Sequence, residues 1–158
     1  METYIDEELE ISIEIENNWH VVNDKEVMKE HLGMKEDELS NTVFILLKVE
    51  NDKFTAFATV TLDLLLYETD AAYQDGLSAN VQAVLDEGSK EHERNKTLTR
   101  AGARLDHITF KDGEKDFMSQ YFVHINDLLV CFSINVKSPG NNHDRDIMNM
   151  VMSIKTVT

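Results

Sequence analysis

The feature that most constrains the fold is the segment 117–136, FMSQYFVHINDLLVCFSINV, whose pattern predicts one long β-hairpin. If Asn126 and Asp127 form a two-residue turn, one face of the hairpin is almost wholly apolar. The opposed pairs on that face are Ile125 with Leu128, Val123 with Val130, Tyr121 with Phe132, Ser119 with Ile134, and Phe117 with Val136. The mixed face pairs His124 with Leu129, Phe122 with Cys131, Gln120 with Ser133, and Met118 with Asn135. Because a one-residue slip would break this match, the hairpin predicts a sheet with one buried face, and a second helix is expected over the mixed face.

A second hairpin is predicted from segments 42–49 and 54–62, with Asn51-Asp52 as its turn. Its expected pairs are Val49 with Phe54, Leu47 with Ala56, Ile45 with Ala58, and Val43 with Val60. The small alanines opposite large residues would let a helix approach closely. That helix is predicted from Thr69 to Glu87, with Gly88 as its stop.

Residues 9–16 alternate strictly and predict a half-buried strand, with Glu10, Glu14 and Glu16 facing water. Trp19 follows this strand, and we interpret it as a lid on the edge of the core. A short surface helix is expected from Asn23 or Asp24 to Leu32, closed by Gly33.

The remaining segments are predicted as follows. Residues 34–41 and 89–96 are expected to be polar connections, and 97–110 should return the chain to the sheet. An Asp112-Gly113 turn would place His107 opposite Met118, but it would also set Arg104 and Asp106 on the apolar side. A final helix from Asp144 to Ile154 should close over the sheet with Ile147, Met150, Val151 and Ile154 on one face.

Length and composition favour a single domain, 1–158, in the cytoplasm. The chain has 158 residues and a formal charge of −15, which disfavours nucleic acid and anionic lipid as partners. It has no apolar run long enough for a membrane span, so no membrane insertion is expected. The single Cys131 is expected to be a buried, inert thiol.

The sequence contains no pattern typical of a catalytic, cofactor-binding or metal site. The histidines have no metal-ligand spacing, and there is no nucleophile elbow, Walker loop or dinucleotide fingerprint. Acidic clusters fall in a turn or on an exposed strand face, where they stay solvated. The sequence therefore predicts that the protein is not an enzyme and needs no cofactor.

A protein partner, basic in character, is the expected ligand. The candidate contact residues are Glu10, Glu14, Glu16, Trp19, Met148 and Met152. The two methionines lie off the main apolar stripe of the last helix, so they form a soft contact surface unless that helix is buried on more than one side. The sequence leaves homo-oligomerisation open.

The order of elements resembles the Mog1/PsbP-like superfamily, including its bacterial members, over about residues 9–155. The carrying segments are the opening strand and tryptophan ISIEIENNWHV, the glycine-led return AGARLDHITF, and the closing helix ending Ser153-Ile154-Lys155. Asn18 stands where the usual member has proline. The resemblance implies an α+β fold, an antiparallel sheet of about six to seven strands flanked by helices in an α/β/α sandwich. It also implies a non-catalytic role, as in a small-GTPase partner and an accessory subunit of photosynthetic oxygen evolution.

The leading functional prediction is a non-enzymatic protein-binding or accessory domain. One specific version is an immunity-type inhibitor that neutralises a basic toxin by electrostatic complementarity. The alternative is a small-ligand carrier with a cleft between the sheet and the helix 69–87, where Ala56, Ala58 and Gly76 would leave space.

Overall fold

A computed structural model describes the chain at residues 2–63, 69–86, 91–112, 115–125, 128–134 and 143–157. The elements in chain order are β1 (Glu2–Asp6), β2 (Ile11–Ile15), β3 (Trp19–Val22), α1 (Lys25–Leu32), α2 (Glu36–Asn41), β4 (Thr42–Glu50), β5 (Lys53–Asp63), α3 (Asp70–Asp86), β6 (Glu91–Leu98), β7 (Arg104–Asp112), β8 (Lys115–Ile125), β9 (Leu128–Ile134), α4 (His143–Met152) and β10 (Lys155–Thr156). No helix among these residues is long and apolar enough to cross a membrane.

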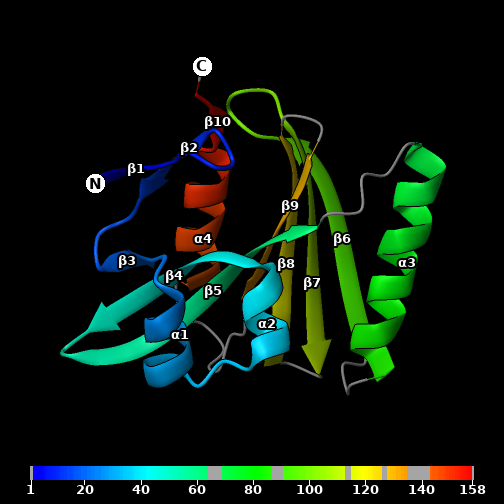
Figure 1. Cartoon of the computed structure of the whole chain (residues 1–158). Coiled ribbons are helices and arrows are strands. Elements are labelled where there is room, and N and C mark those ends of the chain that lie inside the picture. Colours follow the sequence, from blue (N-terminus) through cyan, green and yellow to red (C-terminus); the bar gives the residue numbers. More distant parts are fainter. Residues whose placement is uncertain are drawn as a thin grey trace.

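The strands form two antiparallel sheets. The main sheet has seven strands in the order β3-β4-β5-β9-β8-β7-β6, and a small sheet has three in the order β1-β2-β10. In Figure 1 the small sheet lies with α4 toward one end of the molecule, and α3 stands at the other end beside β6 and β7. The predicted α+β architecture, an antiparallel sheet flanked by helices, is confirmed.

Three apolar clusters hold the layers together, and the strand registers place them on two faces. Tyr121 belongs to the large cluster beneath α4 and the small sheet, whereas its neighbour Phe122 belongs to the cluster beneath α3. Successive residues of a strand point to opposite faces, so α4 and α3 cover opposite faces. The third cluster, of Met28, Leu39 and Ile45, lies beneath α1 and α2 on the same face as α3.

The long hairpin has the predicted register. Its observed pairs run from Ile125 with Leu128 to Ser119 with Ile134, and Tyr121 and Phe132 on the apolar face are completely buried. Burial of each such ring stabilises the fold by about 1.5–3 kcal/mol relative to exposure. The predicted turn and the pairs that involve Asn135 and Val136 lie outside the described residues. The mixed face is covered by a second helix, α3, as expected.

The predicted register of the second hairpin is wrong beyond its first pair. Val49 does oppose Phe54, but a bulge at Lys48 and Val49 then shifts the strand, so Lys48 opposes Ala56. The shift turns Lys48 toward α4, where its Nζ lies 2.9 Å from Oδ2 of Asp146. Ala56 and Ala58 consequently pack beneath α4, on the face away from α3. These alanines therefore do not line a cleft against the helix 69–87, as the ligand-carrier prediction required.

The predicted register of the third hairpin is also wrong. A shift between Phe110 and Lys111 places His107 opposite Tyr121, and the two rings stack at 4.2 Å between centroids. Arg104 and Asp106 then lie on the face covered by α3, where polar partners are available. The Asp112-Gly113 turn itself falls partly outside the described residues.

Helix ends follow the predicted caps where they are described. Asp24 accepts a hydrogen bond from the backbone N–H of Glu26 and caps α1, and Gly33 ends this helix at a φ of 66°. The hydroxyl of Thr69 accepts from the N–H of Ala72 at the start of α3. The expected final helix is confirmed as α4, with its predicted apolar face buried.

Two expected connections are regular elements instead. Segment 34–41 contains α2, and the solvated connector contains the edge strand β6. Every residue of β6 except Arg94 is exposed, so the strand lacks the alternating apolar signal. Its mixed charges are typical of a protected sheet edge.

Candidate functional site

A groove lies between the small sheet and the start of β4. It consists of two hollows of about 380 and 330 Å³ that share Glu8, Asn23 and Val43. One wall is formed by residues 4–9, and the other by Asn23, Lys25 and residues 40–43. We call this continuous depression the β1 groove.

The edge of β1 borders the groove. Tyr4, Ile5 and Asp6 are consecutive, yet all three line it. Side chains alternate between faces along a strand, so the surface these residues have in common is their backbone edge. β1 is the outermost strand of the small sheet, and within the described part of the chain it pairs with β2 alone.

The pairing of β2 shows which backbone groups of β1 point to its free edge. The N–H of Glu14 donates to Oγ of Ser153 at 2.9 Å, away from β1. Glu14 is paired with Thr3, so this is a pair without hydrogen bonds between the two strands. Pairs with and without hydrogen bonds alternate along an antiparallel ladder, so the pair of Ile5 with Ser12 also lacks hydrogen bonds between the strands. Thr3 and Ile5 therefore direct their N–H and C=O groups to the free edge.

A tight turn after β1 places two carboxylates on the rim. Asp6 is 7% exposed, and its carboxylate accepts the N–H of Leu9 at 2.9 Å and the hydroxyl of Tyr4 at 3.4 Å. Burial raises the pKa of Tyr4, a hydrogen bond with Asn23 opposes this, and the Asp6 charge adds to the rise. The Tyr4 hydroxyl thus stays a donor, and the turn it helps to close leaves Glu7 and Glu8 exposed.

The opposite wall carries Lys25, whose side chain is anchored by a hydrogen bond. Nζ of Lys25 donates to the backbone carbonyl of Leu39 at 2.7 Å, near the end of α2. Cations are favoured at this position by the helix dipole. Among the lining residues, the acids Asp6, Glu7 and Glu8 outnumber Lys25 by three to one, a formal charge of −2. The groove is therefore acidic and has a free strand edge along one side.

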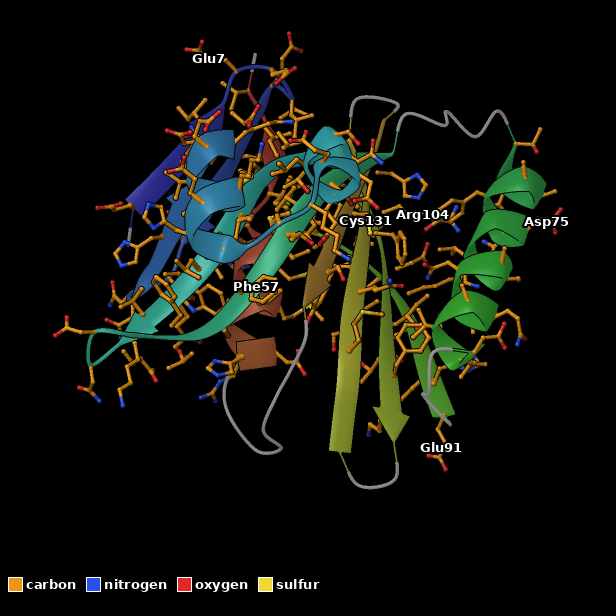
Figure 2. All side chains as sticks on the ribbon, turned by 60° about the horizontal axis from the view of Figure 1, so that its bottom comes forward. Glu7, Phe57, Asp75, Glu91, Arg104 and Cys131 are labelled. Carbon is orange, nitrogen blue, oxygen red and sulfur yellow. The ribbon has the colours of Figure 1, made fainter. Side chains whose placement is uncertain are left out.

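A second polar constellation lies between α3 and the sheet, centred on the fully buried Asp106. Its Oδ2 accepts the hydroxyl of Tyr73 at 2.5 Å and lies 3.4 Å from Nε of Arg104. Its Oδ1 lies 3.7 Å from Nη2 of Arg94. Arg104, labelled in Figure 2 between β7 and α3, also donates to Asp70 at 2.7 Å.

Several groups of this cluster contact one another directly. Burial, and secondarily Asp106, raises the pKa of Tyr73, so its hydroxyl remains protonated. Burial and the charge of Arg104 lower the pKa of His124, whose ring meets Tyr73 edge-on at 4.5 Å. The arrangement fixes α3 to the sheet, and we interpret it as a polar latch.

The structure does not place the predicted contact residues on one exposed surface. Glu10 is exposed in the turn after β1, while Glu14 and Glu16 are half-buried along and beyond β2. Trp19 is 3% exposed and donates from Nε1 to Asp146 at 3.0 Å, so its interpretation as a lid is confirmed. Met148 and Met152 pack against the large core cluster, so α4 is buried on more than one side. Trp19 is thus not part of an open surface.

Sequence reasoning missed the residues that line the β1 groove. A signal was present in Thr3, Tyr4 and Ile5, which favour strands and precede a strictly alternating segment by a short acidic turn. The far wall had no signal, because Asn23 and Val43 belong to separate elements.

The architecture of the chain defines a PsbP-like fold. The solution structure of cyanobacterial PsbP (CyanoP) from Synechocystis sp. PCC 6803 is similar with a TM-score of 0.58 and 10% identity, covering 98% of this chain and 91% of that chain. A crystal structure from Bacteroides thetaiotaomicron VPI-5482 has a TM-score of 0.46 and 9% identity, covering 99% of this chain and 48% of that one. The sequence matches no protein-family model and no curated protein. At these identities the likeness to CyanoP concerns the fold alone, and the predicted Mog1/PsbP-like fold is confirmed.

Proposed function

We propose that this protein is a non-catalytic accessory domain that binds a basic segment of a partner protein in the β1 groove. The observation that carries the proposal is the coincidence, in one groove, of an acidic lining and a free strand edge. A basic toxin would be one partner of this chemistry, which keeps the immunity-type version within the proposal.

Electrostatics support a basic partner. The formal charge of −15 attracts cationic surfaces and speeds their encounter. Glu7 and Glu8 are exposed on the rim, and each exposed ion pair contributes only about 0.2–1 kcal/mol. Loss of both should therefore weaken binding by about 1 kcal/mol, or roughly fivefold.

The test is a quantitative pull-down from the native cell at low and moderate salt, analysed by mass spectrometry. The wild type is compared with Glu7→Gln/Glu8→Gln, which removes two rim charges. The matched control is Asp52→Asn/Asp75→Asn, which removes two exposed charges outside the groove. Asp52 lies in the turn at the other end of β4, and Figure 2 shows Asp75 on α3, far from Glu7.

We expect at least one basic protein that the wild type and the control retain equally. The same protein should be depleted about fivefold on the groove variant and should bind more weakly at the higher salt. The proposal fails if every retained protein binds the groove variant and the control variant equally.

A further inference from the structure

We infer that the partner segment binds as an added β-strand along the free edge of β1, extending the small sheet by one strand. This inference rests on the proposed function and specifies its mode: the occupant is an extended, basic segment of another protein. Main-chain hydrogen bonds would provide the affinity, and alternate side chains the selectivity.

The backbone of β1 is arranged for such an addition. Thr3 and Ile5 are two residues apart, so their outward groups repeat at roughly 6.6 Å, the spacing of an antiparallel ladder. Their N–H and C=O groups point to the free edge of β1 rather than to β2, and Ile5 also lines the groove. The other side of β1 is held by pairing with β2 along its full length, from Glu2 with Ile15 to Asp6 with Ile11.

The surroundings of the edge determine the chemistry of the added strand. Side chains on its inner face would meet Tyr4, Asp6 and Asn23, where a carboxylate and a phenol favour lysine or arginine. Side chains on its outer face would lie beside Ile5, which is 53% exposed and favours an apolar, β-branched neighbour. The preferred segment therefore alternates basic and apolar residues.

The other described edges suit this partner less well. β6 carries Glu91 and Glu93 as well as Arg94 and Lys96, so its charges balance and it lacks the acidic surroundings of β1. β3, the other edge of the main sheet, has the sequence WHVV and carries no acidic residue. β10 consists of Lys155 and Thr156 alone and is too short to support a ladder. Charge and length both favour β1.

The experiment measures the binding of a fluorophore-labelled peptide of alternating lysine and valine by fluorescence anisotropy. Ile5→Pro removes the N–H that faces the groove and is compatible with an edge strand, since that N–H is not used by β2. Ile5→Ala is the matched control, because it removes the side chain and keeps the N–H. A fully N-methylated version of the peptide keeps every charge and loses its backbone donors.

We expect Ile5→Pro to weaken binding of the peptide about tenfold, because one hydrogen bond is lost and a peptide carbonyl is left unpaired. Ile5→Ala should stay within about threefold of the wild type. The N-methylated peptide should bind the wild type at least about tenfold more weakly. If Ile5→Pro fails to fold, Thr3→Pro and the N-methylated peptide make the same test.

Three results would overturn the inference in distinguishable ways. Equal binding of both peptides, with Ile5→Pro equal to Ile5→Ala, would mean that charge alone binds, and the proposed function would survive. If the peptide does not bind, or if its binding does not depend on Glu7 and Glu8, the proposed function is rejected as well. A dimer of the wild type that Ile5→Pro disperses would assign the edge to a second copy of this chain.

Discussion

Substitution of Tyr73 by phenylalanine tests whether a polar latch holds α3 to the sheet. The phenol is the hydrogen-bond donor to Oδ2 of the fully buried Asp106, at 2.5 Å. The ring that remains in Tyr73→Phe still packs against His124 and beneath the guanidinium of Arg104, 4.8 Å from its centroid. The substitution therefore removes one hydrogen bond and little packing.

The expected loss follows from the other contacts of Asp106. Nε of Arg104 is 3.4 Å from Oδ2, and Nη2 of Arg94 is 3.7 Å from Oδ1, so neither replaces the phenol at full strength. A hydrogen bond to a charged group contributes about 1.5–3 kcal/mol. We expect Tyr73→Phe to lower the free energy of unfolding by about 2 kcal/mol, and Tm by about 4–8 °C for a chain of this length.

Urea unfolding monitored by two probes measures this loss. Trp19 is the sole tryptophan and lies beneath α4, on the face away from α3, so its fluorescence reports global unfolding. Far-UV circular dichroism also reports α3, and coincident transitions would support two-state unfolding. A double-mutant cycle of Tyr73→Phe with Asp106→Leu should give a coupling free energy of about 2 kcal/mol. Once Asp106 is replaced, the phenol has no carboxylate to bond, so Tyr73→Phe should cost little more. A loss below about 0.5 kcal/mol in Tyr73→Phe, or an additive cycle, would refute the latch.

Two further substitutions test titratable groups elsewhere in the fold. Burial lowers the pKa of His107, so below about pH 6.5 the unfolded chain binds more protons than the native one. The free energy of unfolding therefore decreases as the pH is lowered, by up to about 1.4 kcal/mol per pH unit. His107→Phe keeps the stack on Tyr121 and should flatten urea-derived stability between pH 7 and 5; an unchanged slope would contradict the assignment. Among the described residues, Asp146→Ala leaves the buried Lys48 with Glu50, at 3.3 Å, as its remaining carboxylate, and it also removes the acceptor of Trp19 Nε1. It should lower the free energy of unfolding by about 3 kcal/mol in urea titrations followed by circular dichroism. A loss under about 1 kcal/mol would show that Lys48 finds another partner.

The parts of the fold that the sequence predicted are those whose signal is local. The long hairpin was predictable because both partners carry the same alternation and a slip would expose Tyr121 and Phe132. The second hairpin failed beyond Val49, because its bulge turns Lys48 toward Asp146, which lies 98 residues further along the chain. No local sequence pattern predicts such a long-range ion pair. The strand β6 was missed because its side chains are exposed and carry no apolar period.

The site was less predictable than the fold, because a groove depends on which segments meet. Glu7 and Glu8 stood in the sequence as one acidic turn among several. Of the partner residues predicted instead, Trp19 is buried, and Met148 and Met152 pack against the large core cluster. The free edge depends on the order β1-β2-β10, which places the last strand beside β2 and leaves β1 outermost. Pairing between the two ends of a chain has no signature in local periodicity.

The small sheet, whose outermost strand borders the β1 groove, is held in place by apolar packing. Ile11, Ile13 and Ile15 of β2 are at most 4% exposed, so the inner face of the small sheet is fixed by packing against the large core. β2 in turn holds β1 by a continuous ladder, which leaves the free edge extended before any partner arrives. A preformed edge spares the binding reaction the entropy of ordering one of its two strands. Salt should therefore act on binding through the charges of Glu7, Glu8 and the partner, while the edge itself, anchored by isoleucines, keeps its geometry.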